Sequence, residues 1–525
     1  MAAAAACLVV LVVPRGGDLA AHLYRTGLVR HGILIWDNLW FGGQYPLTSY
    51  SLLYYPLAAL AGNAALGIGG VVLGAVLFSS VAEREWQAAA RWPARAYAVL
   101  LSGQAFTGAY PFVLGLSMLL ATLWALQRRR LWLAVPCVLL TLGFSPLAFL
   151  FLALVLVAVF LRRGRVTAGT VVVGGAATVA GALQLVLLVL LPTPGLDFPY
   201  SVWWLLAGLA VAAFGVALSL RGRAGWPLAA IFVVWSVASI VAALTPSPVG
   251  RNILRASVFA FPLMLVAARL ADWRPRKLAI AAVAAALAAN VLPYMAMIPD
   301  RSSSADSRAA FWQPLIAYLH AHDPPAFRVE VVETANHWEN YFLPRAGIAL
   351  ARGWYVQLDM ADNRTLYLRR LTGPRYRAWL RARAVRYVVL PHLPSEARYG
   401  GQEARLLESG RSGLHRVWTG AHMTVYALPH ATPLLTGPGA AAITRLGSSR
   451  IAGRVARPGN YVLRVRFNPY WRIARGSLCL AAAGGGTTLL HAVRAGPFAI
   501  QAIETPDGLI SALVKGRSQR CGGER

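Results

Sequence analysis

The sequence predicts a polytopic α-helical membrane protein that continues into a separate tail with an α/β part and a β-sandwich-like part. Of its 525 residues, 57% are hydrophobic and 13% are charged, which is too little charge for the surface of a soluble protein of this length. Long apolar runs fill the chain up to residue 298, and the mean hydropathy of the whole chain is +0.54. Beyond residue 298 the runs are shorter and alternate with polar residues. These observations together define the predicted fold class.

The apolar runs predict about eleven membrane spans, with an uncertainty of about one or two. They cover residues 1–14, 51–80, 94–108, 112–126, 131–145, 147–161, 167–191, 201–220, 226–244, 257–270 and 278–297. Several are shorter than the roughly 20 residues of an ordinary spanning helix. The breaks near 108–111 and 145–146 therefore predict either tilted hairpins or helices interrupted inside the protein.

Arginine predicts the orientation in the membrane. Alternate loops are basic; they contain Arg84, Arg91 and Arg95, then Arg128 to Arg130, Arg162, Arg163 and Arg165, Arg221 and Arg223, and Arg274, Arg276 and Lys277. The loops 108–111, 145–146 and 192–200 have no basic residue. Because basic loops stay in the cytoplasm, we expect a cytoplasmic N-terminus, with segment 15–50 and the tail on the extracytoplasmic side.

Composition predicts four regions along the chain. Residues 1–298 form the membrane domain with its first outer loop at 15–50, and the polar stretch 299–308 is a linker. Residues 309–430 mix helical and strand patterns, and 431–525 alternate like a β-sandwich. We expect the tail after the linker to fold alone. Cys479 and Cys521 both lie in the tail, where oxidation would allow a disulfide, although their spacing does not determine whether they pair.

The outer loop concentrates chemistry that is rare elsewhere in the chain. Asp18, Asp37 and Asp197 are the acids in the outer loops of the membrane domain. If the segment after Pro14 is helical, Asp18 and His22 share one face with two arginines, Arg15 and Arg25. One interpretation is a solvated helix beside the membrane. The other is a functional site, because basic residues on this side oppose the topology rule.

The loop resembles that of membrane glycosyltransferases of the GT-C class, which use polyprenyl-phosphate-linked sugars. Asp18 and His22 match the start of the family pattern. The other matching residues are Gly32, Trp36, Trp40-Phe41-Gly42-Gly43, Pro46-Leu47, Tyr50 and Tyr54-Tyr55-Pro56-Leu57. The chain is most similar to the YfhO-like families and to the bacterial membrane families labelled as related to 6-pyruvoyl-tetrahydropterin synthase. The tail stretches 337–344, 351–359 and 468–473 resemble parts of the same families.

The resemblance implies roles for five polar residues. Asp18 matches the acid that acts as general base toward the acceptor hydroxyl, and His22 would orient it, share that role or contact the phosphate. Arg25, Arg251 and Arg255 are candidates to bind the donor phosphate, because guanidinium makes bidentate contacts with phosphoryl oxygens. Interfacial anchoring explains Arg255 equally well.

Aromatic and polar residues are candidates for substrate contact. In the loop these are Trp36, Asp37, Trp40, Tyr45 and Tyr50, and in the tail His337, Trp338, Glu339 and Trp354. An aromatic belt at the membrane boundary is an alternative for the loop aromatics, and a turn-forming role is an alternative for Asp37. The tail has no zinc-ligand spacing, so we expect no bound metal there. The loop has no DxD pair to support a divalent metal, and metal dependence stays an open alternative at this point.

The predicted function is transfer of a sugar from a polyprenyl-phosphate-linked donor to a cell-envelope glycan or lipid acceptor at the extracytoplasmic face of the membrane. The alternative is a non-catalytic transporter of lipid-linked glycans, or an assembly scaffold with a glycan-binding tail. A transporter more often has ionisable residues within its spans, and the spans here have almost no acids. The net charge of +30 would suit nucleic acid, but no motif for it is present, and we expect no nucleic-acid partner.

Overall fold

The structure is a computed structural model, and it divides into two compact units. It describes residues 2–12, 17–164, 166–191, 198–221, 225–270, 305–368, 370–393 and 400–505, with single positions at 284, 395, 507, 508 and 510. Unit 1 comprises Met1–Leu19 and Tyr50–Ser303, and unit 2 comprises Ala20–Ser49 and Ser304–Arg525. Each unit is described by itself.

The regular elements of unit 1 among its described residues are all helices. Its α-helices are α1 (Ala2–Cys7), the start of α2 (Gly17–Arg30), α4 (Tyr54–Ala61), α5 (Asn63–Trp86), α6 (Arg91–Phe106), α7 (Tyr110–Gln127), α8 (Leu131–Phe144), α9 (Pro146–Arg163), α10 (Ala168–Leu190), α11 (Val202–Arg221), α12 (Gly225–Leu244) and α13 (Ser257–Leu270). A π-helical segment η1 (Leu8–Val12) follows α1, and two 3-10 helices, η2 (Gln87–Ala90) and η3 (Gly250–Ala256), precede α6 and α13.

The composition of these helices identifies a multi-pass membrane protein. Six helical runs within the described residues are long and apolar enough to cross a membrane: Asn63–Phe106, Tyr110–Gln127, Ala168–Leu190, Val202–Arg221, Gly225–Leu244 and Gly250–Leu270. Three apolar helices are shorter: Ala2–Leu11, Leu131–Phe144 and Pro146–Leu161. The count of about eleven spans is not confirmed, and the predicted span 278–297 lies, except for residue 284, outside the described residues.

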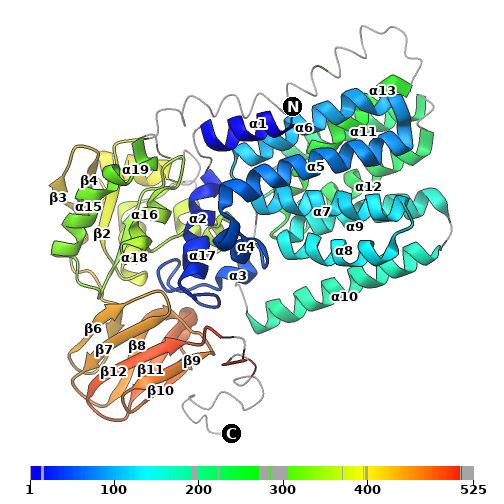
Figure 1. Ribbon diagram of the computed structural model, residues 1–525. Coiled ribbons are helices and arrows are strands. Elements are labelled where there is room, and N and C mark those ends of the chain that lie inside the picture. The colour runs from blue at the N-terminus through cyan, green and yellow to red at the C-terminus, as the bar shows by residue number, and fades with distance from the viewer. Residues whose placement is uncertain are drawn as a thin grey trace. The chain divides into compact units, whose positions relative to one another are not determined.

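Small residues let the helices of unit 1 pack closely. Helix α7 packs against α5, α8 and α9, and α12 packs against α11 and α9 (Figure 1). A Cβ on Gly74 of α5 would come within 2.6 Å of Leu101 and 2.8 Å of Ser117. In a membrane such contacts replace the hydrophobic effect as the force between helices. The side chain of Ser117 donates a hydrogen bond to the carbonyl oxygen of Gly70 at 2.8 Å and so ties α7 to α5.

The first part of unit 2 is an α/β layer. Strands β1 (Arg328–Val331), β2 (Val385–Pro391), β3 (His415–Thr419) and β4 (Met423–Ala427) form one sheet in the order β1-β2-β4-β3, with β1 and β2 parallel and the other pairs antiparallel. Its helices are α15 (Ala309–His322), α16 (Glu339–Arg345), α17 (Val356–Asp362), α18 (Gly373–Ala382) and α19 (Gly401–Glu408). Short 3-10 turns η4 (Ala305–Ser307) and η5 (Arg364–Tyr367) complete it. Buried Tyr376, Leu380, Val385 and Val388 belong to its core.

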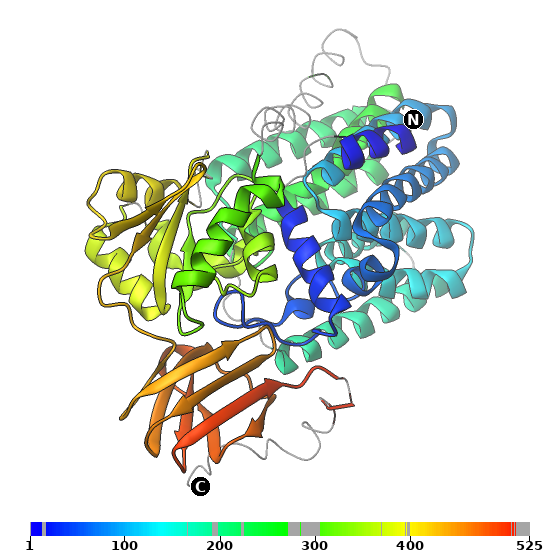
Figure 2. The ribbon, with the colours of Figure 1, turned by 60° about the vertical axis from the view of Figure 1, so that its left-hand side comes forward.

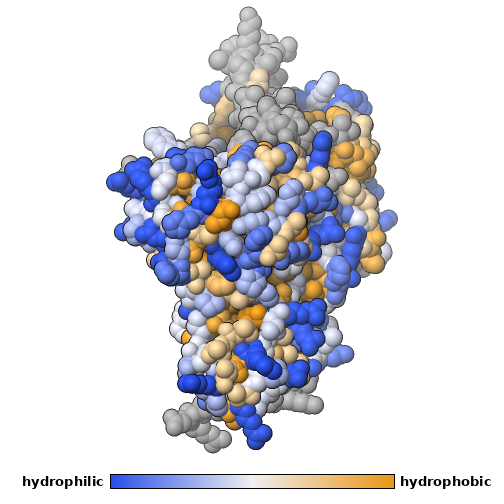
Figure 3. All heavy atoms as spheres, turned by 90° about the vertical axis from the view of Figure 1, so that its left-hand side faces the viewer, coloured by the Kyte–Doolittle hydropathy of each residue, from blue (hydrophilic) through white to orange (hydrophobic). Residues whose placement is uncertain are grey.

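The second part of unit 2 is a β-sandwich. One sheet has the order β10-β11-β8-β5 and the other β6-β7-β12-β9 (Figure 2). The strands are β5 (Leu435–Thr436), β6 (Ala441–Leu446), β7 (Arg450–Val455), β8 (Gly459–Arg466), β9 (Trp471–Arg475), β10 (Leu478–Ala482), β11 (Thr487–Ala492) and β12 (Gly496–Ala502). A 3-10 turn, η6 (Gly484–Gly486), precedes β11. Buried and accessible residues alternate along β7 and β8, as two facing sheets require. Figure 3 shows all heavy atoms from one side, and hydrophilic residues cover much of the surface seen there.

Most of the outer loop belongs to a different unit from the one that the sequence predicted. We expected segment 15–50 to belong to the membrane domain, but residues Ala20–Ser49, which include most of α2 and the short helix α3 (Pro46–Ser49), cluster with the tail. The physical reason is a set of hydrogen bonds to distant residues. The backbone N–H groups of Leu34 and Ile35 both donate to Glu504 Oε2 at 2.8 Å. The loop is therefore a built-in part of unit 2.

The described cysteines of the two units differ in oxidation state. Cys7 and Cys137, both in unit 1, are free thiols. Cys479 on β10 is disulfide-bonded. Cys521 lies outside the described residues. A disulfide in unit 2 is consistent with an oxidising compartment.

Candidate functional site

Asp18 lies at the start of α2 in unit 1, against the turn that joins α6 and α7. Its backbone N–H donates to the carbonyl oxygen of Thr107 at 3.2 Å. Gly108 has a φ of +84°, and a Cβ there would lie 2.6 Å from the backbone nitrogen of Leu19. Only glycine lets this turn approach the helix so closely. A carboxylate in the first turn of a helix is also stabilised by the helix dipole.

Arg255 of η3 forms an ion pair with Asp18. Its Nη2 lies 3.7 Å from Asp18 Oδ2, and the two side chains are 28% and 25% exposed, so both remain accessible to a ligand. The guanidinium carbon of Arg255 also lies 5.5 Å from the ring centre of Phe112 on α7, at cation–π distance. Two residues that sequence analysis assigned to catalysis and phosphate binding, 237 positions apart in the chain, are thus neighbours in one unit.

The 3-10 helix η3 is held rigidly in place. Trp235 of α12 donates its ring N–H to the carbonyl oxygen of Ile253 at 3.1 Å. Gly250 has a φ of +39°, and a Cβ there would lie 1.6 Å from the carbonyl oxygen of Phe198. Arg251, one residue later, places its guanidinium carbon 5.3 Å from the ring centre of Phe198 and 5.9 Å from that of Trp204. The short helix therefore fixes the backbone that carries both arginines.

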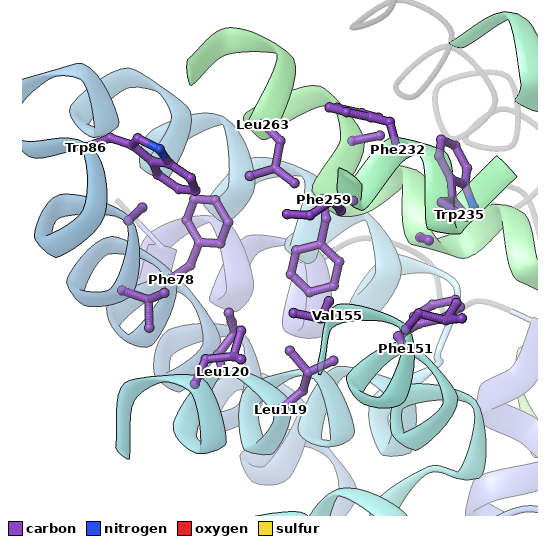
Figure 4. A pocket seen from close by; sticks show the side chains of 17 residues that line it. Phe78, Trp86, Leu119, Leu120, Phe151, Val155, Phe232, Trp235, Phe259 and Leu263 are labelled. Atoms are coloured by element: carbon purple, nitrogen blue, oxygen red, sulfur yellow. The ribbon is translucent and has the colours of Figure 1, made fainter. Parts of the chain in front are cut away.

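Two apolar hollows border η3 within unit 1. One, of about 130 Å³, is lined by aromatic and aliphatic residues of α5, α7, α9, α12 and α13, with Ala256 at its edge (Figure 4). Phe78, Phe259 and Trp235 are among its lining residues. The other, of about 620 Å³, lies between α9 and α12 and includes Val249 and Ile253. Both hollows are suited to hydrocarbon, and each has a lining residue within two positions of Arg251 or Arg255.

Asp37 is buried in unit 2 rather than placed beside Asp18. The hydroxyl of Tyr24 donates to both of its carboxylate oxygens at 3.1 Å, and Gln44 Nε2 donates to Oδ2 at 3.3 Å. The backbone N–H of Leu39 adds a bond of 3.2 Å to Oδ1. Burial raises the pKa of Asp37 to about 6, and these donors limit the rise. The hydrogen bonds that Asp37 accepts stabilise the folded loop.

The aromatic–glycine pattern of the loop forms a tight turn. Gly42 and Gly43 have φ values of +71° and +123°, and a Cβ on Gly43 would lie 2.3 Å from the ring of Trp36. This turn brings Gln44 back to pair with Asp37 in an isolated antiparallel bridge. Trp36 is fully buried, and its ring N–H donates to Asn38 Oδ1 at 2.7 Å. The pattern that matched the family therefore has a clear packing role.

The remaining loop candidates are also enclosed. Trp40 is fully buried against Tyr24, with ring centres 4.6 Å apart, and Tyr45 donates its hydroxyl hydrogen to Asn468 Oδ1 at 3.2 Å. Arg25 is 1% exposed and lies at cation–π distance from Trp40 (5.6 Å) and Tyr355 (5.5 Å). His22 is likewise 1% exposed. Tyr50, in unit 1, is half-buried, and Arg15 lies outside the described residues.

Three of the tail candidates, His337, Trp338 and Glu339, are buried, and the fourth, Trp354, is half-buried. His337 has a φ of +57°, stacks on Trp354 with ring centres 3.3 Å apart, and lies 3.7 Å from Glu339 Oε1. Glu339 accepts hydrogen bonds from the backbone and hydroxyl of Thr334. Trp338 is 1% exposed and packs against Tyr341. Their role in substrate contact stays a prediction.

A buried charge cluster around Arg352 was missed from the sequence. Arg352 makes two hydrogen bonds to Asp359, at 2.7 and 3.1 Å, and ion pairs with Glu333 and Glu403 at 3.0 and 3.1 Å. Burial raises the pKa of Glu403 to about 7 and that of Glu330, 3.5 Å from Arg352, well above its usual value. The stretch 351–359 contains both Arg352 and Asp359, so their spacing was the available signal. The cluster ties β1, α17 and α19 together.

No group of three or more His, Cys, Asp or Glu side chains among the described residues could hold a metal ion. The arrangement at Asp18 and Arg255 consists of one carboxylate and one guanidinium, which can accept a proton and bind an anion.

Comparisons with known proteins find likeness at the level of structure only. No protein-family model matches the chain, and no curated protein matches it. The solved structure of the arabinofuranosyltransferase AftD from Mycobacteria matches with a TM-score of 0.43 and 16% identity, over 81% of this chain and 39% of that one. ArnT from Cupriavidus metallidurans matches with a TM-score of 0.46 and 12% identity, over 81% and 96%.

A second ArnT structure, bound to undecaprenyl phosphate, matches with a TM-score of 0.41 and 13% identity, over 82% of this chain and 97% of that one. AftD and ArnT both belong to the GT-C superfamily of membrane glycosyltransferases. The chain spans less than half the length of AftD. At TM-scores below 0.5, the likeness does not define the fold of this chain, which rests on its own helices and sheets.

Proposed function

We propose that this chain is an integral membrane glycosyltransferase that takes a sugar from a polyprenyl-phosphate-linked donor and adds it to a cell-envelope glycan or lipid. The observation that carries the proposal is the ion pair between Asp18 and Arg255. Each side chain is about a quarter exposed, and η3, which carries Arg255, borders apolar hollows. A carboxylate and a guanidinium next to space for hydrocarbon match a hydroxyl nucleophile and a lipid phosphate leaving group.

In this proposal Asp18 removes the proton of the acceptor hydroxyl. The acceptor oxygen forms a bond to the anomeric carbon of the sugar, and the bond from that carbon to the phosphate oxygen breaks. Arg255 and Arg251 stabilise the negative charge on the departing lipid phosphate. Because Arg255 contacts Asp18, a bound phosphate would compete for the guanidinium and leave Asp18 available as a base.

The polyprenyl chain would occupy the groove of about 620 Å³ between α9 and α12. The residues that line it are aliphatic apart from Thr245 and Ser247, which precede η3 in the chain. This assignment rests on the groove and on the arginines of this chain.

Replacing Asp18 tests the proposal. Asp18→Asn keeps the size of the side chain but removes its proton-accepting charge, so the rate of sugar transfer should fall by about 10²–10⁴-fold. His22→Ala should cost less if the histidine only orients the acid. The assay measures envelope glycan and lipid-linked sugar in cells that depend on each variant, with the membrane level of protein measured in parallel.

The matched control is Glu83→Gln, which also removes one acid from unit 1. Glu83 is exposed on α5 and accepts a hydrogen bond from Ser79 at 2.8 Å. Its loss should leave transfer unchanged. Normal glycan from a stably inserted Asp18→Asn protein would reject the catalytic role and would favour the transporter or scaffold alternative.

A further inference from the structure

One outer face of the β-sandwich has a dense group of arginines. In the sheet β6-β7-β12-β9, the buried side chains of Ile451, Phe498 and Ile500 point into the sandwich. Because side chains alternate along a strand, their neighbours face outward. Exposed arginines occupy that outer face on three of its four strands: Arg445, Arg450, Arg454, Arg472 and Arg475. We call this surface the arginine face.

Strand register shows how close these arginines are. Arg450 and Arg472 are both paired directly with Gln501 of β12, one from each side. With neighbouring strands about 4.8 Å apart, their backbones are about 10 Å from each other. In the next row, Arg445 and Arg475 flank Ala452 and Ala499. Small residues thus separate the guanidinium groups and leave the middle of the face flat.

Within the described part of the chain, no ion pair neutralises the charge of the arginine face. Among the described residues, none of its five arginines forms an ion pair with a carboxylate. By contrast, Arg466 on β8 is paired with Asp362, and Arg464 donates to Thr436 Oγ1 at 2.9 Å. Arginines with an internal role in this unit therefore have identifiable partners.

The outer face of the opposite sheet provides a comparison within the same sandwich. The chain is rich in arginine everywhere, so a random distribution would place arginine on both sheets. The outward residues of β8 and β11 include Asn460, Val462, Leu489 and His491, together with Arg464 and Arg466, which have the internal partners given above. Exposed arginines without an ion pair among the described residues are therefore concentrated on the other sheet, where an external anion would stabilise them.

We infer that the arginine face binds a linear anionic glycan, a polymer that carries carboxylate or phosphodiester groups along its length. Guanidinium groups bind such anions through paired hydrogen bonds, and several spaced rows fit a repeating polymer better than a single small anion. The outward positions between the arginines hold Ala452, Pro497, Ala499 and Gln501. Without an aromatic side chain there, the face has no platform for stacking nucleic-acid bases, and without a large apolar one it has no wedge for insertion into a bilayer. This binding is independent of the proposed transferase reaction.

The test measures binding of the full-length protein, held in phosphatidylcholine nanodiscs, to polygalacturonate as the anionic glycan and to dextran as the neutral one. We expect binding to polygalacturonate only, and weaker binding when salt is raised from about 50 to about 200 mM, because salt screens exposed charges. Replacing three arginines together, Arg450→Gln, Arg454→Gln and Arg472→Gln, should weaken binding about tenfold.

The control removes the same charge elsewhere in unit 2. Arg405, Arg411 and Arg416 are exposed residues of the α/β part, and changing all three to Gln should alter binding less than about twofold. Equal loss in both triple variants would show that net charge, rather than the arginine face, drives binding. Absence of binding to polygalacturonate would overturn the inference, as would arginine-dependent binding only to phosphatidylglycerol liposomes or to an oligonucleotide. Thermal unfolding of each variant verifies that folding is unchanged.

Discussion

Asp18 and Asp37 show how much the surroundings of one residue type can differ within a single short stretch. Asp18 is partly exposed beside a guanidinium, whereas Asp37 is fully buried among neutral donors. The scarcity of acids in the sequence was enough to select both, and the family resemblance was enough to rank Asp18 first. The sequence could not distinguish their surroundings, because Arg255 is 237 positions from Asp18 and Gln44 reaches Asp37 only after the loop turns at Gly42 and Gly43.

Asp37 predicts a pH dependence of stability. Its pKa rises from 3.8 to about 6 on folding because it is buried, so the folded state holds its proton more tightly. Its contribution to stability is complete below pH 3.8 and is lost as the pH rises through about 6, by roughly 3 kcal/mol. Asp37→Asn should remove that part of the pH dependence. Unfolding followed by tryptophan fluorescence between about pH 4 and pH 7.5 measures it.

Glu408→Gln provides the control, because this acid is exposed on α19. The slope of stability against pH should be unchanged in this variant. An Asp37→Asn protein with the full slope of the wild type would show that Asp37 titrates alike in the folded and unfolded states. Glu403 and Glu504, whose pKa values burial raises to about 7, act in the same direction and would remain.

At the scale of elements, the segment Ala20–Ser49 was the most difficult to place from sequence. Apolar runs indicated the membrane-spanning character of unit 1, and alternation indicated a β-rich region after residue 431, because both signals are local. The partners of the segment are not local. The backbone N–H of Asn38 donates to the carbonyl oxygen of Ser448, and that of Arg466 donates to the carbonyl oxygen of Gly42, both at 2.7 Å. No short window of sequence includes both ends of such a bond.

The segment therefore changes the expectation for the isolated tail. In residues 305–525 alone, Trp471 would lack Trp36, the loop residue against which it packs. The carboxylate of Glu504 would lack the two loop N–H groups that donate to it. We expect this fragment to be poorly soluble, and co-expression with residues 20–49 to restore a folded complex. Size-exclusion chromatography and thermal unfolding measure both outcomes.

A 20–49 segment with Trp36→Ala and Asn38→Ala should fail to rescue, because it lacks the stacking ring and the side-chain bond to Gly447. If residues 305–525 were soluble and cooperatively folded without any segment, the loop would be an accessory to unit 2 rather than a part of its core.

For the whole molecule, we propose a cytoplasmic N-terminus and an extracytoplasmic tail, as the arginine pattern predicts. Helix ends in unit 1 support the position of the basic loops at a membrane boundary. The guanidinium carbons of Arg128 and Arg130 lie 4.7 and 5.7 Å from the ring centre of Trp124, and that of Arg95 lies 4.7 Å from Trp92. Tryptophan and arginine together are typical of the interface between lipid and water.

Reporter fusions test this orientation. A phosphatase reporter placed after Arg130 should be inactive and a fluorescent cytoplasmic reporter there should be active, with the reverse pattern after residue 300. A fusion after Arg221, which lies in another basic loop, serves as the second cytoplasmic reference, and one in the loop 108–111 serves as the second external reference. A cytoplasmic tail would remove Asp18 from the extracytoplasmic face and contradict the proposed reaction.

The division of unit 2 into Ala20–Ser49 and Ser304–Arg525 has a consequence for how the protein folds during its synthesis. A ribosome that adds about 5–20 residues per second needs on the order of tens of seconds to make the roughly 250 residues between the two pieces. During that interval Trp36 and Trp40, fully buried in the finished protein, have no partner strand to cover them. We therefore expect the nascent loop to be shielded by a chaperone or by the translocation machinery until the last strands emerge.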